Sequence, residues 1–201
     1  QSSVPLGPLV GVDIGVNTLV AATDGNTAVL VSGREAKAIV QYRNQSNAEL
    51  RSRIDRCKHG SKRRKRLMRA RYRMSDRCAR KLKDVLHKAT RAVANAFPGS
   101  PVVVGKPFNG ASRKMGRVQA QQVSSASNGR LIAQLAYKME GAEQVNEAYS
   151  SQTCPGCGCR HKCRRVYQCS ECGIIAPRDV VGMTNIRRLR VPDSPMPHKL
   201  V

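Results

Sequence analysis

The chain has 201 residues and is strongly basic, with 36 lysines and arginines against 13 aspartates and glutamates and a formal net charge of +23. A charge this large opposes compaction unless a polyanion neutralises it, and nucleic acid is the usual polyanion. No apolar run is long enough to span a bilayer and no stretch resembles a signal peptide, so the sequence argues against a membrane or secreted protein. The first residue is Gln1, from which we expect a segment of a longer protein or a processed product.

The first 40 residues have the composition of β-strands. An apolar run from Pro8 to Ala22 is interrupted by one acid, Asp13, and is followed by a turn at Asp24-Gly25-Asn26. A strand over residues 28–31, across that turn, completes a predicted hairpin. Residues 35–40 fit either a third strand or the start of the helical region that follows.

A run of cations dominates the next segment, where 16 lysines and arginines fall within the 33 residues from Arg51 to Lys83. Apolar residues at roughly helical spacing predict a long helix, or a helical hairpin turning near His59-Gly60-Ser61, with one basic face. Clustered cations repel one another unless phosphates lie between them, so we expect contact with nucleic-acid backbone rather than with bases. A solvated charged helix is the alternative. The expected contacts are Arg63, Arg64, Lys65, Arg66, Arg69, Arg71 and Arg73.

Four further elements are predicted after the basic segment. Residues 101–105 predict a buried strand, residues 130–140 a helix, and residues 145–147 a short strand. A last helix is expected from Asp179 to Arg190, and the proline-rich tail after Val191 is predicted to be disordered.

Two C-x-x-C knuckles, Cys154-Pro-Gly-Cys157 and Cys169-Ser-Glu-Cys172, are separated by eleven residues. Two such knuckles supply the four sulfurs of a closed, structural zinc site. A glycine after each knuckle suits the tight reversal of a zinc ribbon. Two disulfides are the alternative, disfavoured because nothing resembling a signal peptide precedes them. The other cysteines lack this pairing and are expected to be plain thiols or, within the loop, competing ligands: Cys57, Cys78, Cys159 and Cys163.

Asp13 lies within an otherwise apolar strand, where an unpaired carboxylate is costly to bury. A salt bridge to an arginine or a cation shared with other acids would stabilise it. Glu147 and Asp179 also lie at the ends of apolar elements, whereas Glu140 and Glu143 fit the polar side of a helix as ordinary surface charges. Three carboxylates from separate elements can hold two Mg²⁺ ions about 3.5–4 Å apart and support phosphodiester hydrolysis. Spacing alone does not establish that they converge.

The stretch Gly11-Val-Asp13-Ile-Gly resembles the first RuvC motif of the TnpB-like transposon nucleases and the type V CRISPR effectors. The family's remaining motifs follow in order, and the resemblance runs from about Leu9 to Leu189. Its later segments are Asn128-Gly-Arg-Leu131, Tyr149-Ser-Ser-Gln-Thr-Cys154, Cys169-Ser-Glu-Cys-Gly173 and Arg178-Asp-Val-Val-Gly-Met-Thr-Asn185.

The resemblance implies an α/β ribonuclease-H-like (RuvC) fold, a mixed sheet with flanking helices, into which a basic helical segment and a zinc ribbon are inserted. It implies an RNA-guided enzyme that cuts DNA at a two-metal carboxylate site. The implied partners are guide RNA, target DNA and an N-terminal recognition half of the same protein, which is absent here. No membrane partner is expected, and the implied location is the prokaryotic cytoplasm, associated with the nucleoid.

One position departs from the family pattern. In most members the strand that matches residues 102–104 ends in a catalytic glutamate, whereas here Gly105 follows. Some relatives with this glycine carry a glutamate just before the Tyr-Ser-Ser motif, which is Glu147 in this sequence. We therefore expect Asp13, Glu147 and Asp179 to bind Mg²⁺ and catalyse; a free surface Glu147 is the alternative.

The expected organisation is a RuvC-like domain over residues 1–150 with a basic helical insertion at about 41–97, a zinc ribbon at 151–176, the final RuvC helix at 177–190 and a disordered tail at 191–201. The expected function is Mg²⁺-dependent DNA cleavage guided by RNA. Two alternatives remain open: a nuclease-inactive, RNA-guided DNA-binding protein in transcription regulation or transposition, and a transposase that joins DNA ends with the same metal chemistry.

Overall fold

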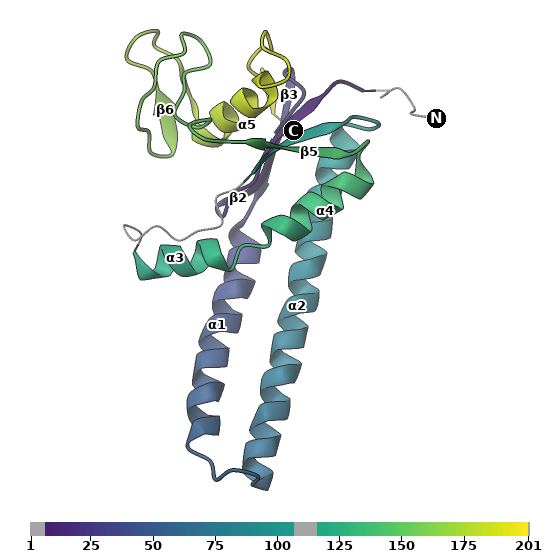
Figure 1. Ribbon diagram of the computed structural model, residues 1–201, viewed down its shortest axis with the longest axis vertical. Coiled ribbons are helices and arrows are strands. Elements are labelled where there is room, and N and C mark those ends of the chain that lie inside the picture. Colours follow the sequence, from purple (N-terminus) through teal and green to yellow (C-terminus); the bar gives the residue numbers. More distant parts are fainter. Residues whose placement is uncertain (1–6, 107–115, 201) are drawn as a thin grey trace.

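A computed structural model describes residues 7–106 and 116–200 and shows a six-stranded mixed sheet from which a long helical hairpin projects (Figure 1). The strand order is β5-β4-β1-β2-β3-β8. Neighbouring pairs are parallel for β1/β4, β4/β5 and β3/β8, and antiparallel for β1/β2 and β2/β3. The strand bounds are β1 Val10–Asp13, β2 Thr18–Thr23, β3 Thr27–Ser32, β4 Val102–Lys106, β5 Ala142–Asn146 and β8 Lys199–Leu200.

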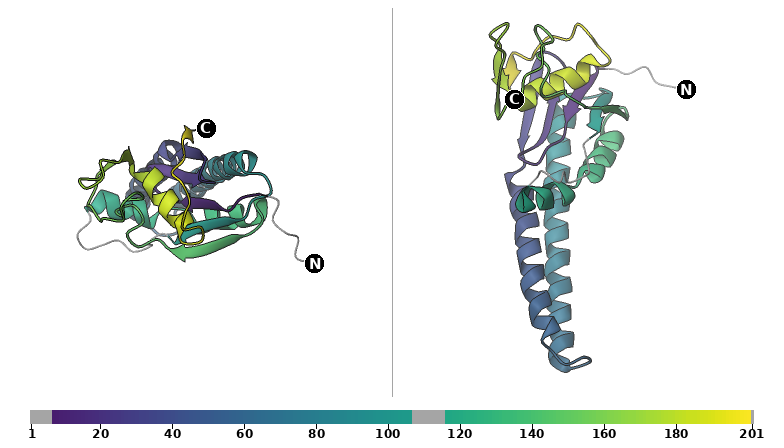
Figure 2. Two further views of the ribbon diagram at one scale, coloured as in Figure 1. Left: turned by 90° about the horizontal axis from the view of Figure 1, so that it is seen from above. Right: turned by 60° about the vertical axis from the view of Figure 1, so that its left-hand side comes forward.

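The hairpin consists of α1 (Arg34–Asp55) and α2 (Lys62–Ala96), joined by a short loop at residues 56–61. This loop lies where the sequence predicted the turn, and Ser61 caps α2 by accepting a hydrogen bond from the backbone N–H of Arg64 at 3.2 Å. Residues 35–40 belong to α1, so the helical segment begins at Arg34 rather than near residue 41. The far end of the hairpin extends well beyond the sheet (Figure 2).

The two faces of the sheet pack against different helices. Val10 and Val12 of β1 join the main core with apolar residues of α2 and of α4 (Asn128–Lys138). Alternate residues face α5 (Arg178–Arg188) on the other side, where Val103 of β4 packs with Ile186. The period of two along each strand therefore directs Asp13 and Gly105 toward α5.

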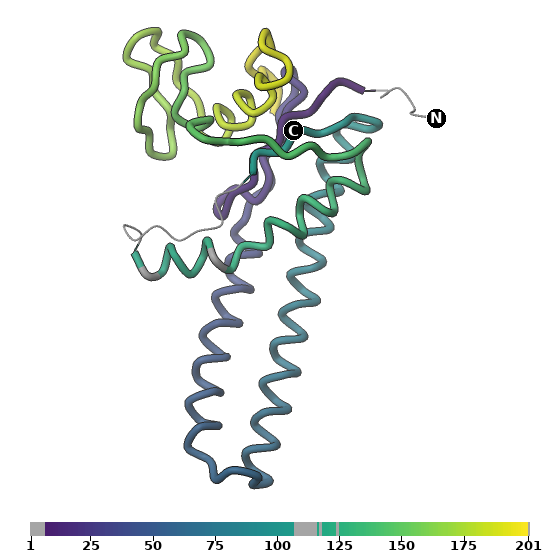
Figure 3. The backbone as a smooth tube through the Cα atoms, in the orientation of Figure 1, coloured from purple at the N-terminus to yellow at the C-terminus, as the bar shows by residue number. Residues whose placement is uncertain are grey.

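A second, two-stranded sheet pairs β6 (Val166–Gln168) with β7 (Ile175–Pro177) and lies between β5 and α5 in the chain. The backbone trace leaves the sheet after β5, forms this ribbon and returns as α5 across the sheet (Figure 3). Its small core contains Tyr167 and Ala176, together with Val181 from α5.

The structure corrects several predicted elements. The apolar run at residues 8–22 forms two antiparallel strands, because the chain reverses at residues 14–17. Glu143 lies on β5 rather than on a helix, where it forms an ion pair with Arg190. Helix α3 (Arg117–Ser124) was not predicted.

The tail after Val191 was predicted to be disordered, and that prediction is wrong for its described part. Ser194 is buried, and β8 pairs with β3 in the main sheet. Hydrogen bonds from Arg187 and Arg188 to Ser194 hold this segment on α5. Its proline content limits regular secondary structure but does not prevent packing.

Candidate nuclease site and cysteine cluster

The three acids singled out in the sequence line one cleft of about 970 Å³ at the edge of the main sheet. Asp13 is the last residue of β1, Glu147 follows the last residue of β5, and Asp179 lies in the first turn of α5. Because β1, β4 and β5 are mutually parallel, their carboxyl ends meet at the same edge. The topology thus brings together acids that are 134 and 32 residues apart in the sequence (13 to 147 and 147 to 179).

Asp13 has an unusual electrostatic environment. Burial and the neighbouring charge of Asp179 raise the pKa of Asp13 from 3.8 to about 6, although Arg178 and the backbone N–H of Ile14 act in the opposite direction. A Cβ atom added to Gly182 would lie 2.5 Å from the Asp13 Oδ2 atom, so α5 approaches this carboxylate through a glycine. A buried acid whose ionised form is disfavoured by a neighbouring carboxylate is suited to binding a cation beside that neighbour.

Glu147 occupies the space beside Gly105. A Cβ atom at position 105 would lie 2.5 Å from Glu147 Oε2 and 3.0 Å from Glu147 Cβ. In the sheet, Gly105 pairs with Val145, two residues before this glutamate. The absence of a side chain at position 105 therefore makes room for the Glu147 carboxylate next to the strand end that lacks an acid.

The carboxylates line a common cleft but do not form a compact ligand cluster. Among the described residues, only the cysteine quartet brings at least three potential ligand atoms within 4.8 Å of one another. The three acids do not all approach one another to within this distance.

Cations surround these acids and were not singled out from the sequence. Arg34, Arg164, Arg165 and Arg178 line the same cleft, so a negatively charged ligand would meet both the arginines and the acids. Thr18, at the start of β2, donates a hydrogen bond to Asp179. Arg178 could have been noticed because it directly precedes Asp179, whereas nothing local distinguishes Arg34 or Thr18.

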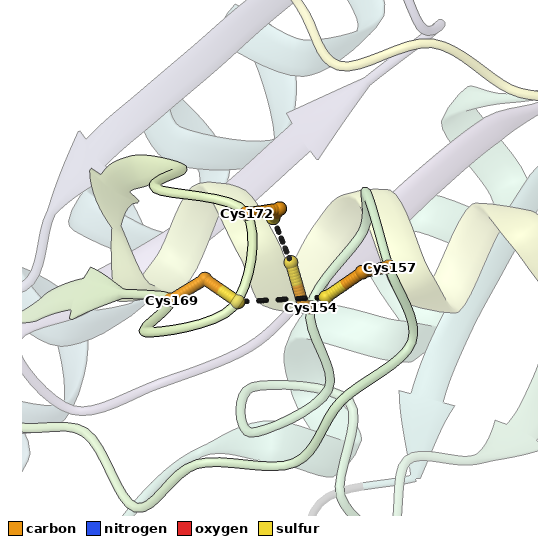
Figure 4. A group of neighbouring side chains, drawn as sticks. All are labelled: Cys154, Cys157, Cys169 and Cys172. Atoms are coloured by element: carbon orange, nitrogen blue, oxygen red, sulfur yellow. Dashed lines mark hydrogen bonds between the residues drawn. The ribbon is translucent and has the colours of Figure 1, made fainter.

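Cys154, Cys157, Cys169 and Cys172 converge on one point, as predicted (Figure 4). The sulfur–sulfur distances are 3.4 Å for Cys154–Cys172 and 3.5 Å for Cys157–Cys169. Tetrahedral coordination with Zn–S bonds of about 2.3 Å requires sulfurs about 3.8 Å apart, so the quartet is compatible with zinc.

Both knuckles have the same backbone geometry. The N–H of Gly158 donates to the Cys154 carbonyl at 3.0 Å, and that of Gly173 donates to the Cys169 carbonyl at 3.1 Å. These glycines have φ angles of 77° and 73°, in the left-handed region that glycine adopts without strain. The predicted reversal after each knuckle is therefore confirmed.

The fold favours the ionised form of one thiol in the quartet, that of Cys154. Burial acts to raise the pKa of Cys154, but the backbone N–H groups of Cys157 and Gly156 and the neighbouring thiols lower it to about 6. A stabilised thiolate is the form that binds zinc. Cys163 instead donates to the Ser151 carbonyl at 3.2 Å, and neither it nor Cys159 belongs to the quartet.

Helix α5 ties the cysteine ribbon to the acid cleft. The Asn185 side chain donates to the carbonyls of Ser150 and Thr153, both at 2.7 Å, and Arg188 donates to the Pro155 carbonyl. The helix that carries Asp179 thus also fixes the turn that leads into the first knuckle.

The basic hairpin presents most of its predicted contacts to solvent. Arg63, Lys65, Arg66, Arg69, Arg71 and Arg73 are exposed. Arg64 is half-buried and donates to the Ile54 carbonyl at 3.0 Å, so it braces the hairpin loop. None of the seven residues lines the acid cleft.

The fold and the two sites define a RuvC-like, ribonuclease-H-like domain with an inserted cysteine ribbon. Residues 4–106 match the profile of the OrfB_IS605 family, described as a probable transposase, and residues 129–186 match the Cas12f1-like TNB domain. The chain is 31% identical over 123 residues to the TnpB-like protein MJ1635 of Methanocaldococcus jannaschii, a match covering 60% of this chain and 29% of that protein. The chain belongs to the OrfB_IS605 family and is TnpB-like.

Solved structures of type V effectors share the fold. The Cas12f1–sgRNA–target DNA complex matches with a TM-score of 0.60 and 15% identity, covering 92% of this chain and 39% of that one. CasPhi-2 (Cas12j) bound to crRNA and phosphorothioate-DNA matches with a TM-score of 0.53 and 12% identity, covering 95% and 46%. The chain thus spans less than half the length of each of these relatives.

The helices of the described segments do not meet the requirements of a bilayer crossing. None of them, including the 35-residue α2, combines sufficient length with an apolar composition.

Proposed function

We propose that this chain is the nuclease domain of an RNA-guided DNA endonuclease, in which Asp13, Glu147 and Asp179 support phosphodiester hydrolysis with Mg²⁺. The observation that carries the proposal is the convergence of these acids, from three separate elements, on one arginine-lined cleft. The family relationship supports the same class of activity.

The residues of the cleft fit magnesium. Mg²⁺ prefers oxygen ligands and is usually held by a small number of carboxylates together with water and substrate phosphates. Burial and Asp179 raise the pKa of Asp13 despite the nearby Arg178, so its ionised form is only partly compensated, and a bound cation would supply the remaining positive charge. When bound, paired Mg²⁺ ions activate water and stabilise the leaving oxygen.

The protein's own groups would position the reactants. Thr18 would hold Asp179 in a fixed orientation through its hydrogen bond, and the cleft arginines would bind the phosphates that flank the cleaved bond. Zinc in the cysteine quartet would be structural, because four thiolates leave no open position for substrate.

Guide RNA and target DNA are the proposed partners, together with a recognition half of the same protein. The exposed cations of the α1–α2 hairpin would bind the phosphates of the guide–target heteroduplex or of the displaced strand, while base pairing reads the sequence. Residues 1–150 and 177–190 would form the nuclease domain and residues 151–176 the zinc ribbon. These partners would place the protein at the prokaryotic nucleoid.

The test is cleavage of target DNA by the full-length guided complex carrying Glu147→Gln. The substitution preserves the shape of the side chain and removes its charge, so cleavage should be abolished while target binding is retained; Asp13→Asn should behave in the same way. Glu143→Gln is the matched control, because Glu143 lies on β5, the strand that leads to Glu147, and is exposed in an ion pair with Arg190.

Two results would contradict the proposal in different ways. Full cleavage by Glu147→Gln would show that this glutamate is not a ligand of the catalytic metal. Guided DNA binding without cleavage by the unmutated complex would favour the nuclease-inactive binding protein, for which the lack of an acid at Gly105 is the supporting observation.

A further inference from the structure

Tyr149 has a backbone conformation that its side chain does not favour. Among the described residues it is the only non-glycine with positive φ, at 64°. The backbone N–H of Ser150 donates to the Glu147 carbonyl at 3.0 Å, which places Tyr149 third in a four-residue turn, a position where positive φ normally selects glycine or asparagine. A tyrosine here indicates that the side chain itself has a use.

The conformation is held in place by the turn that follows. The Tyr149 carbonyl accepts hydrogen bonds from the backbone N–H groups of Gln152 and Thr153, at 2.9 and 3.0 Å, and from the Thr153 hydroxyl at 3.1 Å. The side chain nevertheless remains 54% exposed. The ring is therefore presented to solvent rather than buried in a core.

Arg160 lies over this ring, with its guanidinium carbon 4.4 Å from the ring centroid. The first cysteine knuckle fixes the position of the arginine. Arg160 pairs with Thr153 in an antiparallel bridge, and the next residue, His161, donates its backbone N–H to the Gln152 carbonyl at 2.9 Å. A guanidinium stacked on tyrosine extends the planar surface and adds a positive charge to it.

The segment that carries Tyr149 borders the acid cleft. Glu147, Ser150 and Ser151, which flank Tyr149 in the chain, all line that cleft. A strand whose phosphate was bound among the carboxylates would therefore run beside the segment that carries this ring.

We propose that Tyr149 and Arg160 form a stacking platform for one unpaired base of the DNA strand that enters the carboxylate cleft. The inference rests on the proposed nuclease function and names two residues that would hold the substrate strand beside the cleft. Every base has a π-face, so the platform would hold the strand without selecting a sequence.

The test uses the 201-residue chain in magnesium-free buffer, with single-stranded oligothymidylates that carry one 2-aminopurine at successive positions. Stacking should quench the fluorescence at one position. Tyr149→Phe keeps the ring and should retain quenching and affinity. Tyr149→Asn tolerates positive φ but lacks the ring, so it should lose the quench and about fivefold to a hundredfold in affinity. Tyr137→Asn, which removes a 63% exposed tyrosine on α4, should change neither.

The zinc content and thermal stability of each variant show whether the turn has kept its structure. A Tyr149→Asn variant that is equally or more stable, yet binds the oligonucleotide like the parent, would overturn the proposal, because the strained residue would then serve only the turn. An equal loss in Tyr149→Phe would also overturn it. These readouts need no cleavage, so an inactive carboxylate site would refute the proposed nuclease without affecting the platform.

Discussion

Asp13→Asn should stabilise the magnesium-free protein at neutral pH while it removes a residue proposed to be essential for cleavage. The pKa of Asp13 is raised from 3.8 to about 6 in the folded chain, mainly by burial and then by Asp179. A group with a raised pKa binds its proton more tightly in the folded state. Its contribution to stability is therefore complete below pH 3.8 and is lost as the pH rises through 6.

The size of the effect follows from the shift. A difference of roughly two pKa units corresponds to about 3 kcal/mol between the protonated and ionised forms. At about pH 7.5 the ionisation of Asp13 destabilises the folded protein by almost this whole amount. At about pH 4.5 it does so by only about 1 kcal/mol. Since asparagine has nearly the same shape and does not ionise, its stability advantage over aspartate should grow by about 2 kcal/mol between these conditions.

Urea unfolding of both proteins at the two pH values, with zinc retained and magnesium absent, measures this difference. Glu140→Gln is the control, because Glu140 is exposed and a surface substitution of this kind should change the free energy of unfolding by no more than about 0.5 kcal/mol. Added Mg²⁺ should stabilise the aspartate form more than the asparagine form. An advantage that does not change with pH would refute the electrostatic account of this site.

Three further outcomes are expected. One zinc should bind per chain. Cys154→Ser should lose both the metal and the folded ribbon, because the free energy of metal binding in such sites is largely free energy of folding. Undiminished zinc in metal analysis of this variant would contradict the prediction. Neutralising three exposed cations of α2 should weaken nucleic-acid binding. The slope of log affinity against log salt concentration should become shallower by about 0.7–0.9 for each phosphate contact that is lost. An unchanged slope would mean that this face is only solvated. The residues are Arg63, Lys65 and Arg66. Gly105→Ala should displace the Glu147 carboxylate, because the added methyl would lie 2.5 Å from Oε2. Cleavage should therefore fall although Asp13 and Asp179 are unchanged. Full cleavage would show that this packing does not matter.

The features that the sequence predicted best are those that depend on local geometry. Each C-x-x-C knuckle closes its own turn within five residues, so the convergence of the four sulfurs required only that two knuckles meet. The turn between α1 and α2 was similarly marked by residues 59–61. Asp13 could be identified from the sequence because a lone acid in an apolar strand is costly to bury in any fold.

The arrangement of the acid cleft depends on contacts that no local pattern encodes. Glu147 approaches Gly105 because β4 and β5 are parallel neighbours, an order set by the packing of α4 and α2 beneath the sheet. The resemblance to a known family supplied that relationship, whereas composition and spacing did not. The order of the tail was missed for the same reason, since β8 at its end pairs with β3, which lies near the other end of the chain.

The junction between the ribbon and α5 has a mechanical consequence. Strand β7 ends at Pro177 and α5 begins at Arg178, so no linker separates them. Asn185 and Arg188 also bind the segment that enters the first knuckle. The ribbon therefore cannot swing as an independent flap. A displacement of the ribbon would therefore act on Asp179, because this acid lies in the first turn of α5, directly after the last strand of the ribbon.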